Sequence, residues 1–202
     1  MRSGDYTSVG LAADCRRTTP SGFLPLLALP YGWLFALDAA SVGVQRHWFN
    51  QSVKHGNWSH DVSTMDGWST SPAMREWRSA NPKKRYPPEG AAWWRVSFLS
   101  TELFEEPSAR SLPAGAEVAI ALSAACGELS AWVNGLPVNA TAWRADPTAP
   151  MLIRVDRRLW NLKRGRINTV ALRFAADSSH NCSSDVHGAG LRGRVYVVGK
   201  YV

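Results

Sequence analysis

Short segments in which every second residue is apolar recur along this chain, and this alternation constrains the fold more than any other feature. The clearest segments are residues 91–98, 117–122, 129–133, 151–155 and 167–174. A period of two sends neighbouring side chains to opposite faces of a strand, so each segment predicts a strand with one buried face. Asn134-Gly135 directly follows one of these runs, and this dipeptide between apolar runs predicts a tight β-hairpin.

Weaker signals bring the total to about eight short strands. These signals lie at residues 33–38, 136–138 and 194–198. Helical periodicity is nearly absent, apart from single turns expected near residues 72–77 and 156–160. The pattern predicts an all-β antiparallel sandwich of jelly-roll type and disfavours a parallel α/β fold, whose crossover helices are missing.

The length of 202 residues fits one domain. Residues 1–28 are expected to form a flexible N-terminal tail, and residues 29–202 to form the sandwich. The long stretch 45–90 is expected to be mostly irregular, and loops of that length inside a domain are usually functional. Arg16-Arg17 precedes the apolar run 23–30 in the manner of a signal peptide, which favours an extracellular location, although Pro25 and Pro30 interrupt the run.

The chain is basic, with 23 Lys and Arg against 16 Asp and Glu, a formal charge of +7. This sum alone does not choose among nucleic acid, anionic lipid and acidic polysaccharide. No run approaches the roughly 20 apolar residues that a membrane span needs. The main expectation includes neither a membrane nor a nucleic acid as partner. The basic sets that could meet a carboxylate, sulfate or phosphate are residues 83–85 with Tyr86, and Arg154, Arg157, Arg158, Lys163, Arg164 and Arg166.

Cysteines and modification motifs leave several alternatives open. Cys15, Cys126 and Cys182 are odd in number, so at least one stays free, and a disulfide between Cys126 and Cys182 is one alternative. Asn-X-Ser/Thr sequons occur at Asn50, Asn57, Asn139 and Asn181. They matter only if the chain is secreted by a glycosylating cell.

Motifs for catalysis are missing from the sequence. It contains no G-x-S-x-G, no phosphate-binding glycine loop and no H-E-x-x-H. No spacing singles out the pair of carboxylates that glycoside cleavage needs. His55, His60 and Asp61 lie close together and could bind zinc, but their spacing matches no established motif, so no metal is expected.

Tryptophan is unusually frequent, with ten residues. Trp33, Trp94 and Trp132 lie in strand patterns and are expected to pack in the core or against a sheet. Five others lie in loop-like contexts: Trp48, Trp58, Trp68, Trp77 and Trp143. An indole combines a flat apolar face with a polar N–H at its edge, which suits the flat face of a pyranose ring. At least one of the five is expected to bind sugar, while the others close the ends of the sandwich.

Six ordered segments between residues 29 and 200 carry a family resemblance. They include the hairpin Trp132-Val-Asn134-Gly135 and the turn Gly165-Arg-Ile-Asn168-Thr169. The segments are 29–38, 42–49, 89–98, 129–138, 163–174 and 188–195. In this order they resemble the sugar-binding jelly-roll domain (galactose-binding-like fold) of glycoside hydrolase family 2 enzymes, the β-galactosidase and β-glucuronidase group.

This resemblance implies an accessory role. In that family the catalytic glutamates lie on a later barrel domain, to which no segment here corresponds. The loop before the last strand lines the sugar pocket in some members, and Ser184, Asp185 and His187 match that stretch by position. The resemblance implies no cofactor, although many domains of this fold carry a structural calcium ion.

The sequence therefore predicts a non-catalytic carbohydrate-binding module. Stacking on a sugar ring is assigned to Trp58, Trp68, Trp77 or Trp143. Asp185 and His187 are expected to hydrogen-bond hydroxyl groups, and Arg85 to meet an acidic substituent. Two main alternatives remain: a fragment or separate subunit of a β-galactosidase-like glycosidase or sugar esterase, and a structural sandwich that binds proteins. Nucleic-acid binding is a minor alternative, whose signature would be an affinity that falls steeply with salt.

Overall fold

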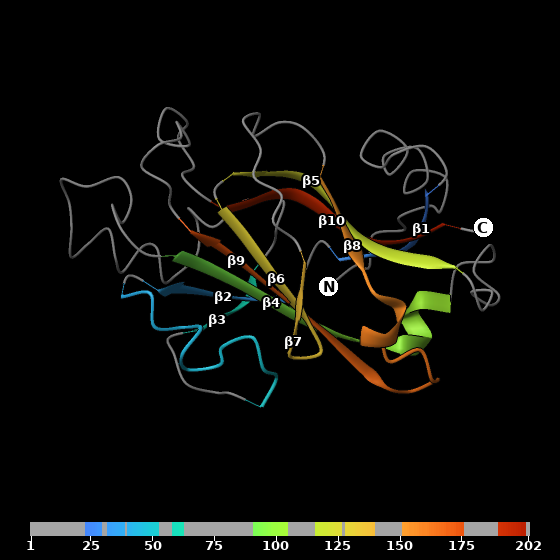
Figure 1. Ribbon diagram of the computed structural model, residues 1–202, viewed down its shortest axis with the longest axis horizontal. Coiled ribbons are helices and arrows are strands. Elements are labelled where there is room, and N and C mark those ends of the chain that lie inside the picture. The colour runs from blue at the N-terminus through green and yellow to red at the C-terminus, as the bar shows by residue number, and fades with distance from the viewer. Residues whose placement is uncertain are drawn as a thin grey trace, which may run out of the picture.

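Two antiparallel sheets face each other in the computed structural model (Figure 1). It describes residues 23–29, 32–38, 40–52, 58–62, 91–104, 116–126, 128–139, 151–175 and 190–200. The smaller sheet has the order β1 (Phe23–Ala28), β10 (Gly190–Lys200), β5 (Glu117–Cys126), β8 (Met151–Val155). The larger sheet has the order β3 (Ser59–Val62), β2 (Trp33–Asp38), β4 (Ala91–Leu99), β9 (Ile167–Ala175), β6 (Glu128–Val133), β7 (Leu136–Val138). The 3-10 helices η2 (Ser100–Phe104) and η4 (Arg157–Leu159) complete the elements of the described residues.

This arrangement confirms the predicted antiparallel β-sandwich. Every segment predicted as a strand is a strand, and η4 lies where a helical turn was expected near residues 156–160. The alternation also assigns the faces correctly. Trp94, Val96 and Phe98 of β4 point into the core between the sheets, where Trp33 is also fully buried.

The predicted boundary between tail and sandwich at residue 29 is wrong. Residues 23–28 form β1, which pairs with β10 along the edge of the smaller sheet. Proline cannot donate to a ladder, so Pro25 would be unfavourable in the interior of a sheet. An edge strand has a neighbour on one side only, and β1 shifts its register between Pro25 and Leu27, so the proline is accommodated. Residues 1–22 lie outside the described residues.

The stretch 45–90 is less irregular than expected in the parts that the structure describes. It contains β3, a four-residue edge strand that pairs with β2. β3 escapes the alternation pattern because Ser59-His60-Asp61-Val62 is almost wholly polar. The turn expected near residues 72–77 lies outside the described residues.

The hairpin between β6 and β7 forms as predicted. Asn134 and Gly135 have φ angles of 53° and 81°, the positive values that a two-residue hairpin turn of this kind requires. The Asn134 side chain also ties the turn to its surroundings. Its Nδ2 donates to Leu159 O at 2.7 Å and to Asn168 Oδ1 at 3.0 Å, and its Oδ1 accepts from Thr169 N at 2.8 Å. Two asparagines that carried the family resemblance thus stabilise the fold.

Candidate functional site: the outer aromatic cluster

The outer face of the larger sheet carries a second group of buried aromatic side chains, separate from the core. We call it the outer aromatic cluster; it comprises Trp48, Phe49, Trp58, Trp93 and Trp132. It arises because Trp93 of β4 and Trp132 of β6 point away from the core, opposite their inward neighbours. Ala36 and Ala171 lie beside them on β2 and β9 and leave room for the indoles.

The rings of this cluster pack closely. Trp93 and Trp132 stack with their centroids 5.1 Å apart, and Phe49 stacks on Trp132 at 5.2 Å with an interplanar angle of 6°. Trp48 lies 6.1 Å from Trp93 and 5.7 Å from Trp58. Such ring pairs contribute about 0.5–1.5 kcal/mol each beyond the area they bury.

Asp38, at the end of β2, fixes the loop that covers the cluster, which we call the 40–52 loop. Its Oδ1 accepts from Val42 N at 2.8 Å. Its Oδ2 accepts from Gly43 N at 2.7 Å and from the Trp93 indole Nε1 at 3.0 Å. A Cβ on Gly43 would lie 2.5 Å from Trp93 Nε1, so this close approach requires glycine. Sequence reasoning did not single out Asp38 as a residue of the site.

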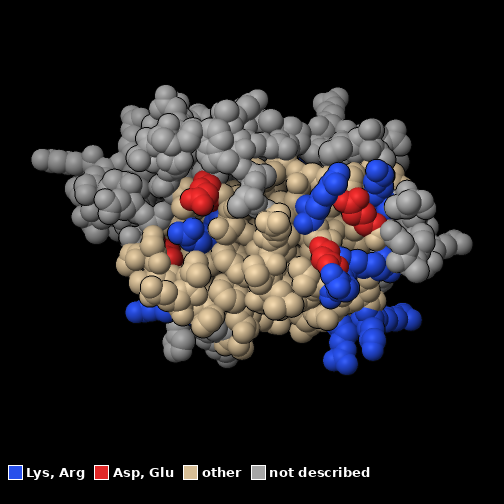
Figure 2. All heavy atoms as spheres, viewed as in Figure 1, with Lys and Arg blue, Asp and Glu red and all other residues tan. Residues whose placement is uncertain are grey.

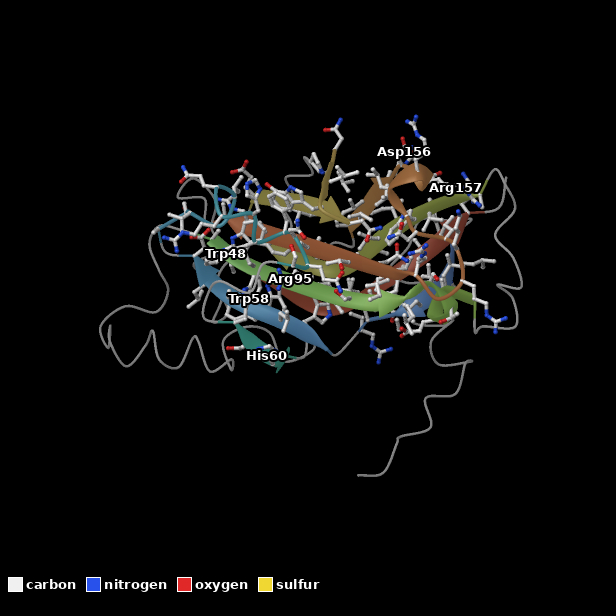
Figure 3. The ribbon with its side chains drawn as sticks, turned by 90° about the horizontal axis from the view of Figure 1, so that it is seen from below. Trp48, Trp58, His60, Arg95, Asp156 and Arg157 are labelled. Atoms are coloured by element: carbon white, nitrogen blue, oxygen red, sulfur yellow. The ribbon has the colours of Figure 1, made fainter. Side chains whose placement is uncertain are left out.

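Arg95 holds the far end of the same loop. It is 5% exposed, and its Nη1 donates to Trp48 O at 2.9 Å and to Asn50 O at 2.6 Å. Its guanidinium carbon lies 4.6 Å from the centre of the Trp58 ring, within cation–π distance. Burial lowers the pKa of Arg95 from its usual value. Figure 3 shows Trp48, Trp58 and Arg95 gathered at this place.

In the alternating segment 91–98, Trp94 and Val96 share the buried face, so the pattern predicts that Arg95 faces away from the core. The alternation of β4 predicted that direction correctly, but it carried no sign that a loop more than 40 residues earlier in the chain covers this face. One signal in the sequence could have predicted this cover: Trp93 shares the outward face of β4 with Arg95. If that face were open to water, the indole would expose a large apolar area.

The structure describes one of the predicted sugar-binding residues. Trp58 lies just before β3, is partly buried, and packs against Arg95 and Trp48. The other predicted residues lie outside the described residues: Trp68, Trp77, Arg85, Trp143, Asp185 and His187. Trp48 lies in the 40–52 loop, in agreement with its loop-like context in the sequence, and it is 5% exposed. The aromatic packing under the 40–52 loop buries it.

The predicted packing tryptophans behave as expected. Trp33 and Trp94 are fully buried in the core, and Trp132 is 8% exposed within the outer aromatic cluster.

Several described carboxylates are occupied by structural contacts. Glu102 accepts from Leu99 N at 2.6 Å, and Glu117 lies 3.4 Å from Arg154 Nε. Asp156 caps η4 and pairs with Arg158, which lowers the pKa of Asp156 to about 2. Arg154 and Arg158 of the basic set therefore have acidic partners. Figure 2 shows blue and red side chains next to each other on this face, and a blue group at the lower right that has no red neighbour.

Among the residues that the structure describes, no three His, Cys, Asp or Glu side chains lie together in a way that could hold a metal ion. His60 is exposed on β3, and His55 and the Asp61 side chain lie outside the described part. In that part of the chain, no helix is long and apolar enough to cross a membrane.

Comparisons with known proteins give similarity at the level of structure. No protein-family model matches the chain, and no curated protein sequence does. Solved structures of β-glucuronidase from Ruminococcus gnavus do match. In complex with C6-substituted uronic isofagomine, that enzyme gives a TM-score of 0.55 at 13% identity, over 90% of this chain and 30% of that chain. Its complex with D-glucaro 1,5-lactone gives 0.53 at 14% identity, with the same coverage.

At these identities the similarity shows a shared fold. The chain spans about 30% of the length of the β-glucuronidase chains it matches. The family resemblance expected from the sequence is therefore supported as a resemblance of fold to one region of such an enzyme.

Proposed function

We propose that this chain is a non-catalytic carbohydrate-binding β-sandwich module of the type attached to glycoside hydrolases. The observation that carries the proposal is the fold match, which covers 90% of this chain and a limited region of a β-glucuronidase. The solved β-glucuronidase structures include complexes with uronic ligands. For the present chain, an oligo- or polysaccharide, neutral or acidic, is the proposed ligand.

Trp58 is the described residue on which the proposed site is built. It lies at the margin of the outer aromatic cluster, partly buried, with Arg95 packed over its ring. A ring held in this way is pre-oriented, so binding a sugar costs little side-chain entropy. The exposed His60 follows two residues later on the edge strand β3 and adds a polar side chain to this edge of the sheet (Figure 3).

The remaining members of the proposed site are those assigned from the sequence. Trp68, Trp77 and Trp143 supply further stacking surfaces, and Asp185 and His187 hydrogen-bond hydroxyl groups. Arg85 pairs with an acidic substituent, for which a guanidinium is suited because it makes bidentate bonds to carboxylates and sulfates.

A titration of the purified chain with neutral and acidic oligosaccharides, followed by calorimetry and tryptophan fluorescence, tests the proposal. We expect saturable binding of one glycan class. Replacement of Trp58, Trp68, Trp77 and Trp143 together by alanine should abolish it while circular dichroism stays unchanged. If the four substitutions leave the affinity as it was, sugar stacking on these residues is refuted.

Single variants sharpen this test. Trp58→Phe keeps an aromatic ring against Arg95 but removes the indole, and we expect it to weaken binding several-fold. Trp160→Phe is the matched control, because Trp160 is buried in the core beside Phe98 and should not affect affinity. Arg85→Ala should weaken binding of acidic glycans and leave neutral ones unaffected.

A second candidate function is an accessory subunit or fragment of a larger glycosidase. The observation in its favour is that the chain matches only 30% of the β-glucuronidase chain. The test is to examine the open reading frames beside the gene for a catalytic barrel and to co-express it with this chain. Co-purification with glycosidase activity supports this function; glycan binding by the chain alone, with no such neighbour, argues against it.

A further inference from the structure

The 40–52 loop ends in a sequon whose side chains already interact. Asn50-Gln51-Ser52 is one of the four Asn-X-Ser/Thr motifs of the chain, and all three residues are exposed. Asn50 Oδ1 accepts a hydrogen bond from Ser52 N at 3.1 Å and another from Ser52 Oγ at 3.0 Å. The motif therefore forms an Asx turn, in which the hydroxyl that defines the sequon bonds to the acceptor amide.

The backbone and the side chain of Asn50 make different contacts. Its backbone is anchored, because Asn50 O accepts from Arg95 and Asn50 N donates to His47 O at 2.9 Å. The residue is exposed, and in the part of the chain that the structure describes nothing accepts a hydrogen bond from its Nδ2. A group attached to Nδ2 would displace no packed side chain.

We propose that Asn50 is an N-glycosylation site of this protein. The donor is an oligosaccharide carried on a lipid diphosphate, the co-substrate that a glycosylating cell supplies to sequons in its secretory pathway. Nδ2 bonds to the anomeric carbon of the sugar and loses one proton to a basic group of the transferase. The bond from that carbon to the diphosphate oxygen breaks, and the lipid diphosphate leaves. No oxidation or reduction takes place.

Asn50 differs from the other three sequons of the chain. Asn57 and Asn181 lie outside the described residues, and Asn139 is exposed while the two residues that complete its motif lie outside. At Asn50 the complete motif is visible, exposed and internally bonded. The site is independent of the proposed sugar binding, because it needs only entry into the secretory pathway.

Peptide mass spectrometry tests this site directly. The full chain, behind a secretion signal, is translated with microsomes, and the protease-protected lumenal fraction is digested with trypsin. Cleavage after Arg46 and Lys54 isolates the peptide 47–54, which contains Asn50 as its only sequon. We expect this peptide to carry an oligosaccharide that an amidase releases, converting Asn50 to Asp.

Sequon variants decide whether the motif directs the modification. Ser52→Ala should leave Asn50 unmodified, and Ser52→Thr should restore the glycan. Thr141→Ala, which removes the sequon at Asn139, is the matched control and should leave peptide 47–54 modified. An unmodified peptide 47–54 in the lumenal wild-type chain overturns the proposal, and so does a glycan on Asn50 that persists in Ser52→Ala.

Discussion

The most informative perturbation of the candidate site is Asp38→Ala, because one carboxylate joins the 40–52 loop to the sheet beneath it. The substitution removes the acceptor for three donors. Two of them, Gly43 N and Trp93 Nε1, make buried bonds to Oδ2, and the third, Val42 N, is partly buried. A buried donor left without a partner costs about 1–3 kcal/mol. The two buried donors therefore predict a loss of about 2–6 kcal/mol, while water can replace the bond to Val42.

Urea denaturation followed by tryptophan fluorescence measures this loss as the free energy of unfolding. Asp38→Asn keeps the shape and one acceptor oxygen, so we expect a smaller loss of about 1–3 kcal/mol. Glu128→Ala is the matched control: Glu128 is an exposed strand carboxylate, and its change should stay within about 0.5 kcal/mol. If Asp38→Ala lies within about 1 kcal/mol of the wild type, the carboxylate does not fix the loop as argued.

Local detachment provides a second readout for the same variant. The 40–52 loop contains the exposed Arg46, after which trypsin cleaves. In the wild type the loop is held at Asp38 and at Arg95, which limits the opening that cleavage requires. We expect Asp38→Ala to be cut at Arg46 faster than Glu128→Ala under native conditions. Equal cleavage rates would contradict a role of Asp38 in closing the loop.

The remaining predictions concern three other positions. Gly43→Ala places a Cβ 2.5 Å from a Trp93 atom, and we expect it to cost about 1–3 kcal/mol in thermal or urea unfolding; an unchanged midpoint would contradict this packing. Asn134→Ala removes three side-chain hydrogen bonds at about 1 kcal/mol each, so we expect a loss of about 3 kcal/mol by the same assay, against no loss in the exposed control Asn139→Ala. Asp156 should titrate by NMR with a pKa of about 2 instead of 3.8. Because the pKa of Asp156 is lower in the folded state, the stabilisation is present above about pH 3.8 and is lost as the pH falls toward 2. Arg158→Ala should return the pKa of Asp156 toward 3.8. A wild-type pKa already near 3.8 would refute the pairing.

Local sequence patterns were sufficient to predict the strands that form the core. In β4 and β9 the alternation assigned the inward side chains correctly. Successive side chains of a strand point to opposite faces of the sheet, so every second residue enters the core. Asn134-Gly135 predicted its hairpin because the signal lies in the backbone preferences of two adjacent residues. The edge strands β1 and β3 were missed because they lack the alternating pattern. β1 contains a proline, and β3 consists mostly of polar residues.

The sequence by itself determined a sandwich of alternating strands, its hairpin, and a surplus of tryptophan that the core alone does not use. The tertiary structure decided what covers the outer face of the larger sheet. Asp38 and Arg95 meet the 40–52 loop through contacts with Gly43, Trp48 and Asn50, and the Arg95 contacts are separated by 45 and 47 residues in sequence. The alternation along one strand does not predict such contacts, because they depend on which sheet face a loop from elsewhere in the chain covers. For that reason Arg95, predicted only to face away from the core, is a buried residue that holds the candidate site together.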